Sequence, residues 1–290
     1  MNQIRILLHT LRFHQWIKNV LCLAGVFFSR HVFDTNVLMK GVLCFGAFSF
    51  ASSAVYIFND WQDRLRDQLH PKKSKRPIAS GLVSKRYATG LALVCLALGL
   101  SAGAFLGKAV LLILAIYLIQ NVLYSMYLKH VAILDVIIVS LGFVWRALAG
   151  VAAANVPLSS WLVLCTFLLS LFIALDKRRN ELTASVGDSS KHREVLNYYS
   201  EPFLDQVLSI TSACAIIAYA LYCLDQATVA KFNHHLLLTV PFVIFGVFRY
   251  LMLTQKGHGG DPIETFLTDR SLIITSLLWT SILIYLIYII

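Results

Sequence analysis

Long apolar stretches separated by short polar segments make up most of the chain. A helix that crosses the hydrocarbon core of a bilayer, about 30 Å thick, needs about 20 predominantly apolar residues. Measured against that length, the sequence predicts about nine transmembrane helices, although Lys18, Asn19 and Arg30 interrupt the first and leave an eight-helix arrangement open. The expected helices cover 16–33, 36–59, 86–106, 108–128, 130–153, 158–176, 203–225, 234–254 and 271–289.

The N-terminal segment, residues 1–15, has a different pattern. Arg5, His9 and Arg12 are interleaved with four apolar residues at the i, i+3, i+4 and i+7 positions of one helix face. This spacing predicts an amphipathic helix, and such helices lie in the membrane interface with their apolar face toward the acyl chains. We therefore expect an interfacial helix before the first span.

Composition supports an integral membrane protein. Hydrophobic residues make up 58% of the 290 residues and charged residues 14%, whereas soluble domains average about 45–50% and about 25%. The excess excludes a soluble domain, a disordered chain and a secreted disulfide scaffold. The six cysteines lie in apolar stretches without a Cys-x-x-Cys pair, so we expect buried thiols rather than a metal site. The expected fold is all-α, with residues 1–290 as a single transmembrane domain.

Orientation follows from the distribution of positive charge, because lysine and arginine accumulate in cytoplasmic loops. With the N-terminus inside, 20 of the 25 Lys and Arg residues fall on the cytoplasmic side. The long polar segments 60–85, 177–202 and 255–270 share that side, so we expect the chemistry at the cytoplasmic face of the cell membrane. The net charge of +10 is then explained by this bias, anionic lipid or a phosphorylated ligand, and we expect no nucleic acid partner.

Four oxygen-bearing side chains, named here the carboxylate row, follow the second predicted span: Asn59, Asp60, Asp63 and Asp67. On a continuing helix, residues at i, i+4 and i+8 share one face. Crowded carboxylates repel one another unless a cation lies among them, and an all-oxygen ligand set suits Mg²⁺. The alternative is a helix end whose acids are solvated or paired with Arg64 and Arg66.

A basic loop, His70 to Pro77, follows the carboxylate row and contains Lys73 and Arg76. Fixed cations beside Mg²⁺ indicate a diphosphate site, because Mg²⁺ commonly binds through one or two carboxylates and the phosphates of its substrate. The alternative is the ordinary positive charge of a cytoplasmic loop.

A second polar cluster, Asp176 to Leu182, ends the sixth predicted span. Lys177 and Arg178 are each at helical spacing from Glu181, so this segment is either a self-paired surface helix or a pair of phosphate ligands. The segment 255–270 contains Gly257, Gly259 and Gly260, which indicates a linker or a mobile carrier of a carboxylate.

Arg146 lies within a predicted span, where an ionised side chain is costly and is a functional candidate. Asp135 lies on the same helix face but roughly 16 Å away, too far for direct pairing. We therefore expect Arg146 to find a partner on a neighbouring helix, on backbone carbonyls or on an anionic headgroup. The sequence contains no Gly-x-Ser-x-Gly elbow, phosphate-binding P-loop or dinucleotide fingerprint, which disfavours a hydrolase or an ATP-driven protein.

These motifs resemble the UbiA superfamily of intramembrane transferases, whose first signature reads Asn-Asp-x-x-Asp-x-x-x-Asp. The carboxylate row and the segment Arg76 to Gly81 carry the resemblance. Within the superfamily, the chain looks most like the branch of decaprenyl-phosphate phosphoribosyltransferases. The features similar to that branch are Gln15-Trp16-x-Lys18-Asn19, His70-Pro71-x-Lys73-x-x-Arg76-Pro77, Leu128-Lys129 leading to Asp135, Gly142-Phe143-x-x-Arg146, Lys177-Arg178-x-x-Glu181-Leu182, His192-Arg193 leading to Tyr198, and Phe248-Arg249-Tyr250-Leu251.

The resemblance implies about nine helices around a central cavity, with Mg²⁺ as cofactor, phosphoribosyl pyrophosphate as donor and a polyprenyl phosphate as acceptor. It implies catalytic roles for Asp60, Asp63, Asp67 and Glu181, with Asn59 as a further metal ligand. Substrate-binding candidates divide into two groups and a remainder. They are Lys73, Arg76, Lys177 and Arg178 for donor phosphates; Lys18, Lys129 and Arg146 for the acceptor phosphate or the 5-phosphate; and Asn19, Arg249 and Tyr250 without a finer assignment.

One departure from the wider superfamily helps to distinguish a prenyl diphosphate donor from a phosphoribosyl pyrophosphate donor. Prenyl-transferring members usually carry a second acidic motif, whereas this chain has Asp176, Lys177, Arg178 and Glu181 there. The added cations favour a donor with an additional phosphate. The alternatives are prenyl transfer to an aromatic or hydrophobic acceptor and, from a different class, a lipid or ion transporter. Self-association into a homo-oligomer is a further expectation from the apolar helix faces.

Overall fold

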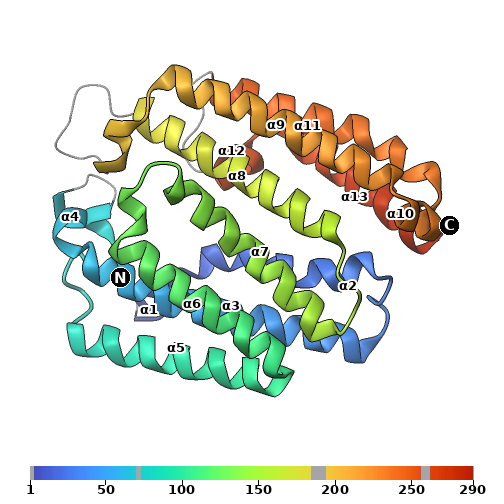
Figure 1. Cartoon of the computed structure of the whole chain (residues 1–290). Helices are drawn as coiled ribbons and strands as arrows, with labels where there is room; N and C mark the ends of the chain where they lie inside the picture. Colours follow the sequence, from blue (N-terminus) through green and yellow to red (C-terminus); the bar gives the residue numbers. More distant parts are fainter. Residues whose placement is uncertain (1–2, 70–72, 184–193, 256–261, 290) are drawn as a thin grey trace. The chain divides into compact units, whose positions relative to one another are not determined.

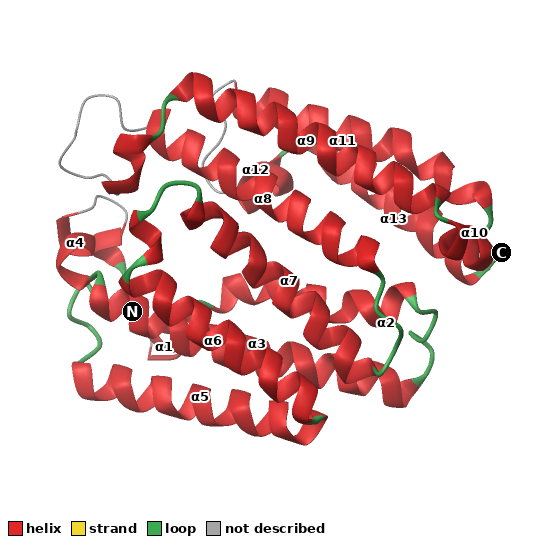
Figure 2. Cartoon of the chain, in the orientation of Figure 1, coloured by secondary structure: helices red, strands yellow, loops and turns green. Residues whose placement is uncertain are grey.

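The computed structural model describes residues 3–69, 73–183, 194–255 and 262–289. All regular structure within these ranges is helical, and they contain no strand (Figure 2). Several residues of the sequence motifs lie outside the described residues: His70, Pro71, Lys72, His192, Arg193, Gly257, Gly259, Gly260 and Asp261.

Eight helical segments of the described chain are long and apolar enough to cross a membrane. Their positions confirm an all-α polytopic membrane protein and the eight later spans of the sequence prediction. They are α3 (Thr35–Gln62), α5 (Lys85–Leu106), α6 (Lys108–Met126), α7 (Leu134–Ala154), α8 (Ser160–Thr183), α9 (Glu201–Leu224), η6 with α11 (His234–Thr239 and Val240–Leu253) and α13 (Arg270–Tyr288). The shorter elements are α1 (Gln3–Thr10), α4 (Arg64–Leu69), η2 (Lys73–Lys75), η3 (Leu128–His130), η5 (Glu194–Tyr198), α10 (Gln226–Phe232) and α12 (Pro262–Thr268).

The first predicted span, 16–33, is not a single α-helix. Residues 16–28 belong to the 3₁₀-helix η1 (Phe13–Leu23) and the short helix α2 (Ala24–Phe28), and residues 29–33 are not helical. A 3₁₀-helix has three residues per turn, so side chains at i and i+3 align. Trp16 and Asn19 use this alignment to donate hydrogen bonds to Ser53 and Ser49 of α3, at 3.1 and 3.0 Å. Asn19, one of the polar residues that interrupt the apolar pattern, is therefore a contact to the neighbouring helix.

The chain divides into two compact units. The first comprises 1–131 and 141–158, and the second comprises 132–140 and 159–290. In the first unit, α5 runs beside α3 (Figure 1), and a Cβ on Gly99 would lie 3.0 Å from the carbonyl oxygen of Ala47. Glycine therefore permits the close approach that membrane helices use instead of a hydrophobic driving force.

The second unit has its own core, built from α8, α9, α11 and α13. Phe172, Leu204 and Leu272 are buried in it, from three different helices. Outward faces of helices in both units remain apolar; Phe105 of α5 and Leu277 of α13, for example, are exposed. Exposed apolar faces of this extent fit contact with lipid, as expected for an integral membrane protein.

Candidate active site

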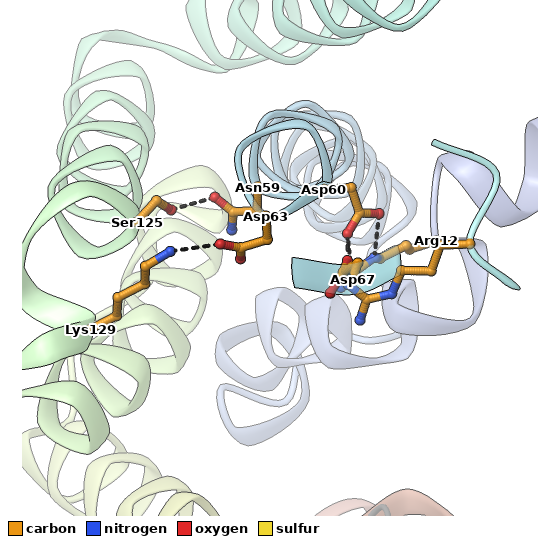
Figure 3. Close-up of polar contacts among 8 residues, drawn as sticks. Arg12, Asn59, Asp60, Asp63, Asp67, Ser125 and Lys129 are labelled. Carbon is orange, nitrogen blue, oxygen red and sulfur yellow. Dashed lines mark hydrogen bonds and ion pairs between the residues drawn. The ribbon is translucent and has the colours of Figure 1, made fainter. Parts of the chain in front are cut away.

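The carboxylate row lies in the first unit, at a break between two helices. The helix α3 ends at Gln62, Asp63 follows as its cap, and α4 begins at Arg64. The sequence predicts one continuing helix with all four side chains on one face. The structure differs: Asn59 and Asp63 point to one side, and Asp60 and Asp67 lie on the other (Figure 3). The four side chains therefore form two pairs, one of two carboxylates and one of an amide and a carboxylate, instead of one cluster.

The first pair, Asp60 and Asp67, is buried and surrounded by guanidinium groups. Nη1 of Arg76 lies 2.9 Å from Oδ1 of Asp60 and 2.6 Å from Oδ2 of Asp67. Arg12 also contacts Asp60 through two nitrogens, with Nη2 toward Oδ1 and Nε 3.3 Å from Oδ2 (Figure 3). Two carboxylates and two guanidinium groups thus form a compact cluster with no net charge.

The second pair, Asn59 and Asp63, contacts the end of α6 and the turn after it. The hydroxyl of Ser125 donates a hydrogen bond to Oδ1 of Asn59, and Nζ of Lys129 lies 3.0 Å from Oδ1 of Asp63 (Figure 3). Lys129, like Arg12, therefore comes from a distant segment, whereas Arg76 comes from the basic loop that follows the row. Arg64, which the sequence offers as a local partner, places its guanidinium group 5.0 Å from the ring centre of Trp61.

The ligand chemistry of the first pair fits Mg²⁺. Within the described residues, no three His, Cys, Asp or Glu side chains are gathered closely enough to hold a metal by themselves. Mg²⁺ usually needs only one or two carboxylates, with water and phosphate oxygens completing its octahedron at about 2.0–2.1 Å. The Asp60 and Asp67 oxygens already share Nη1 of Arg76. Because both carboxylates contact the same nitrogen, Asp60 and Asp67 are the two residues that would hold the cation.

Arg12 is a site residue that sequence reasoning did not select. The N-terminal pattern places it on the interfacial helix, but α1 ends at Thr10, and Arg12 has left-handed backbone angles (φ 51°, ψ 47°) as the cap of η1. Non-glycine residues in this region are uncommon and cluster at functional sites. Its guanidinium group lies 4.9 Å from the ring centre of Tyr56. No pattern around Arg12 indicates its contact with Asp60, because the two residues are 48 positions apart in the sequence.

Arg146 is buried in the first unit and has found protein partners. Its Nε lies 2.6 Å from Oδ1 of Asn19, its Nη1 lies 2.5 Å from the Gly142 carbonyl oxygen, and its Nη2 lies 3.0 Å from the Tyr117 hydroxyl. These contacts agree with the expected partners on neighbouring helices and backbone carbonyls. They join η1, α6 and α7, so Arg146 and Asn19 organise the helices beside Lys18.

The remaining first-unit candidates are Lys18 and Lys73. Lys18 is half-buried on η1. Its charge interacts with Tyr56 of α3, and the charges of Arg12 and Arg146 interact with the same tyrosine. Lys73 lies on η2, where its carbonyl oxygen accepts the backbone N–H of Arg76 at 3.0 Å. The first unit therefore carries basic side chains on η1, η2, η3 and α7, and it carries the carboxylate row on α3 and α4.

The second unit holds Glu181, Lys177 and Arg178 on α8, and Arg178 is buried. Its Nε lies 2.5 Å from Oδ2 of Asp135, and its Nη1 lies 2.7 Å from Oε2 of Glu181. The pairing of Arg178 with Glu181 is the one expected of a self-paired helix, whereas the contact with Asp135 joins α8 to α7. Lys177 is exposed.

Tyr199 completes this network and was not selected from the sequence. Its hydroxyl donates to Oδ1 of Asp135 at 2.6 Å and accepts the backbone N–H of Ile133 at 2.6 Å. Ile133 has a φ of 71°, which is costly for a β-branched residue and indicates a position fixed by its surroundings. Burial raises the pKa of Tyr199, and its hydrogen bond to Asp135 raises it further.

Arg249 and Tyr250 are neighbours on α11 with different contacts. Arg249 forms two hydrogen bonds with Asp269, the cap of α13, at 3.2 and 2.7 Å, and these bonds hold the pKa of Asp269 below its usual value. The hydroxyl of Tyr250 donates to Oδ2 of Asp176 at 2.8 Å. The two residues therefore connect α11 to α13 and to α8.

Comparison with known proteins places these geometries in a family context. The model of the UbiA prenyltransferase family matches residues 19–277. A decaprenyl-phosphate phosphoribosyltransferase of Corynebacterium glutamicum is 33% identical over 98% of this chain and 87% of the relative. One from Mycolicibacterium smegmatis is 34% identical over 94% of this chain and 89% of the relative. A UbiA homolog from Archaeoglobus fulgidus bound to GPP and Mg²⁺ has a TM-score of 0.74 and 20% identity, covering 97% of this chain and 98% of that one.

Proposed function

The chain belongs to the UbiA prenyltransferase family, and on that premise we propose that it transfers 5-phosphoribose from phosphoribosyl pyrophosphate to a polyprenyl phosphate. Two relatives named decaprenyl-phosphate phosphoribosyltransferase align with more than nine tenths of this chain and support the proposal. The observation that carries it is the set of basic side chains beside the carboxylate row: Arg12, Arg76 and Lys129. A donor with a diphosphate and a separate 5-phosphate needs more fixed positive charge than a prenyl diphosphate does.

Mg²⁺ is the proposed cofactor, held by Asp60 and Asp67 with Asn59 and Asp63 beside them. When bound, it supplies Lewis-acid neutralisation of the diphosphate leaving group. Arg76 and Lys73 are proposed to contact the donor diphosphate, since Arg76 already lies between the two carboxylates. Lys18, Lys129 and Arg146 are proposed to bind the 5-phosphate or the acceptor phosphate.

In the second unit, Lys177 and Arg178 are proposed as further donor-phosphate ligands, with Glu181 as an accompanying carboxylate and Arg249 and Tyr250 as substrate-binding residues. Lys177 is the exposed member of this set and Arg178 the buried one. Because Arg178 already contacts two carboxylates, its proposed contribution is to fix α8 as well as to attract phosphate.

The proposed reaction breaks the bond between C1 of the ribose and the diphosphate oxygen, and diphosphate leaves with the electron pair. Positive charge develops on the sugar, and carboxylates such as Asp63 stabilise it electrostatically. An oxygen of the acceptor phosphate, already anionic, forms the new bond to C1 from the opposite face, so no strong base is required. The expected product is polyprenyl-phosphoryl 5-phosphoribose with inverted configuration at C1.

We place the N-terminus and the site on the cytoplasmic side of the cell membrane. The distribution of Lys and Arg supports this orientation, with 20 of 25 on one side. Residues 1–290 are proposed to act as one catalytic domain, since the family match runs through both compact units.

The test offers the purified protein two donors side by side in the presence of Mg²⁺. Labelled phosphoribosyl pyrophosphate with polyprenyl phosphate is expected to yield labelled lipid, whereas labelled prenyl diphosphates with aromatic acceptors are not. Transfer from prenyl diphosphate alone would contradict the proposal in favour of prenyl transfer. Binding of Mg²⁺ or substrate without release of diphosphate from either donor would instead favour a transporter.

A further inference from the structure

The guanidinium groups of Arg12 and Arg76 occupy the carboxylates that Mg²⁺ would use. Asp60 and Asp67 have exposed fractions of 5% and 4%, and each is in contact with at least one guanidinium group. A buried carboxylate that loses its partner becomes an uncompensated charge, which is strongly unfavourable. Mg²⁺ at these oxygens would compete with the guanidinium groups, and a guanidinium group that is displaced needs another anion.

Charge makes this exchange depend on the donor. Two carboxylates and two guanidinium groups sum to zero, so Mg²⁺ alone would leave two uncompensated positive charges in a partly buried site. Diphosphate supplies negative charge and pairs of oxygen acceptors, which a planar guanidinium group binds through two parallel hydrogen bonds. The arrangement therefore disfavours Mg²⁺ alone and favours Mg²⁺ together with diphosphate.

The surroundings of Arg12 allow its guanidinium group to exchange one anion for another while its backbone stays in place. The backbone around it is fixed, because the Ser53 hydroxyl donates to the Leu11 carbonyl oxygen at 2.8 Å and the Gln15 N–H donates to the Arg12 carbonyl oxygen at 2.7 Å. The ring of Tyr56 lies 4.9 Å from its guanidinium group and retains a cation by its π face whichever anion the group contacts.

We propose that Arg12 is a diphosphate-binding residue which, in the ligand-free protein, closes Asp60 to Mg²⁺ together with Arg76, so that metal and donor enter the site cooperatively. The inference deepens the proposed function, because it names the residue that couples the metal to the donor. It applies to any diphosphate donor, so it does not depend on phosphoribose being the group transferred.

The test measures metal binding without turnover. Mn²⁺, which also takes oxygen ligands, is titrated into the full-length protein with and without inorganic diphosphate and followed by electron paramagnetic resonance. The wild type is expected to bind Mn²⁺ weakly alone and about ten- to a hundredfold more tightly with diphosphate, the range of one or two charge-assisted hydrogen bonds. Arg12→Gln is expected to bind Mn²⁺ alone more tightly than the wild type and to lose most of the gain from diphosphate.

Arg5→Gln is the matched control, because it removes the same charge from an exposed position on α1. Arg12→Lys keeps the charge without the planar fork, and we expect intermediate coupling. Arg12→Gln binding like Arg5→Gln, or weaker binding of Mn²⁺ alone, would overturn the inference. If Arg12→Gln does not fold, unchanged coupling in Arg12→Lys would do the same.

The outcome is separable from that of the proposed function. A protein that shows the Arg12-dependent coupling but transfers no phosphoribose would retain this inference and lose the proposed donor. A protein that transfers phosphoribose with the same KM for the donor in Arg12→Gln and the wild type would retain the function and lose the inference.

Discussion

The ammonium nitrogen of Lys129 lies 3.0 Å from Oδ1 of Asp63, although the two residues are 66 positions apart in the sequence. The contact connects the turn η3 to the break between α3 and α4. It places a cation beside the carboxylate row in a partly exposed ion pair, because the exposed fractions of the Lys129 and Asp63 side chains are 18% and 37%. Lys129 can therefore leave Asp63 for a phosphate at little cost.

Replacing Lys129 with glutamine separates binding from folding. The free energy of unfolding should change by less than about 1 kcal/mol, because partly exposed ion pairs contribute little. The KM for a phosphorylated substrate should rise about tenfold or more, because a charge-assisted hydrogen bond is lost. Steady-state kinetics and thermal unfolding measure the two effects. Lys129→Arg should recover part of the affinity, and an unchanged KM in Lys129→Gln would exclude Lys129 from the site.

Asp63→Asn and Asp67→Asn should each abolish transfer while the protein stays folded. The amide has nearly the same shape as the carboxylate but lacks the charge that Mg²⁺ requires. Asp34→Asn is the matched control, because Asp34 caps the opposite end of α3 and asparagine caps equally well. Near-native turnover of either row variant at ordinary Mg²⁺ concentrations would refute the metal assignment.

Arg146→Lys should destabilise the protein by about 2 kcal/mol or more. A lysine cannot reproduce the three hydrogen bonds to Asn19, Gly142 and Tyr117, and charged hydrogen bonds contribute about 1.5–3 kcal/mol each. Unfolding in detergent measures the change, and the exposed Arg86→Lys is the control. A double-mutant cycle with Asn19→Ala should show strong coupling. Additive effects would mean that this contact does not hold η1 against α7.

Tyr199→Phe should lose stability in a pH-dependent way. The pKa of Tyr199 is raised in the folded protein, so its contribution is complete below the unfolded pKa of about 10 and is lost as the pH rises further. The difference in unfolding free energy between wild type and Tyr199→Phe should be about 1–3 kcal/mol at neutral pH and should shrink above about pH 10. Tyr198→Phe, at an exposed neighbouring position, should show neither effect. A difference that stays constant with pH would contradict the bridging role of the hydroxyl.

The eight later spans could be predicted because span length and apolar content are local properties. The first span could not, because Trp16 and Asn19 make polar contacts with α3 that no local pattern reports. Trp16 and Asn19 are three residues apart in the sequence, but this spacing alone does not predict a 3₁₀-helix. The 3₁₀-helix is favoured because Ser53 and Ser49 of α3 lie opposite these two side chains. Tertiary contact decides the backbone here, rather than intrinsic preference.

The candidate site shows the same division. The spacing of the carboxylate row and its basic neighbours indicated a metal and diphosphate site, and Arg76 does lie between Asp60 and Asp67. The contact between Arg12 and Asp60 depends on packing between segments 48 residues apart. The spacing of the row also did not indicate that α3 ends before Asp63. The contact of Arg12 with Asp60 was therefore missed, whereas Arg76 and Lys129 were already candidates and lie beside the row.

The most direct test of the central claim is the identity and stoichiometry of the product. The purified protein is incubated with phosphoribosyl pyrophosphate, Mg²⁺ and polyprenyl phosphates of several lengths, and the lipid extract is analysed by mass spectrometry while released diphosphate is counted. We predict a lipid heavier by one phosphoribosyl group, formed one for one with diphosphate and absent in Asp67→Asn. No phosphoribosylated lipid under conditions in which a prenyl diphosphate is consumed would contradict the account.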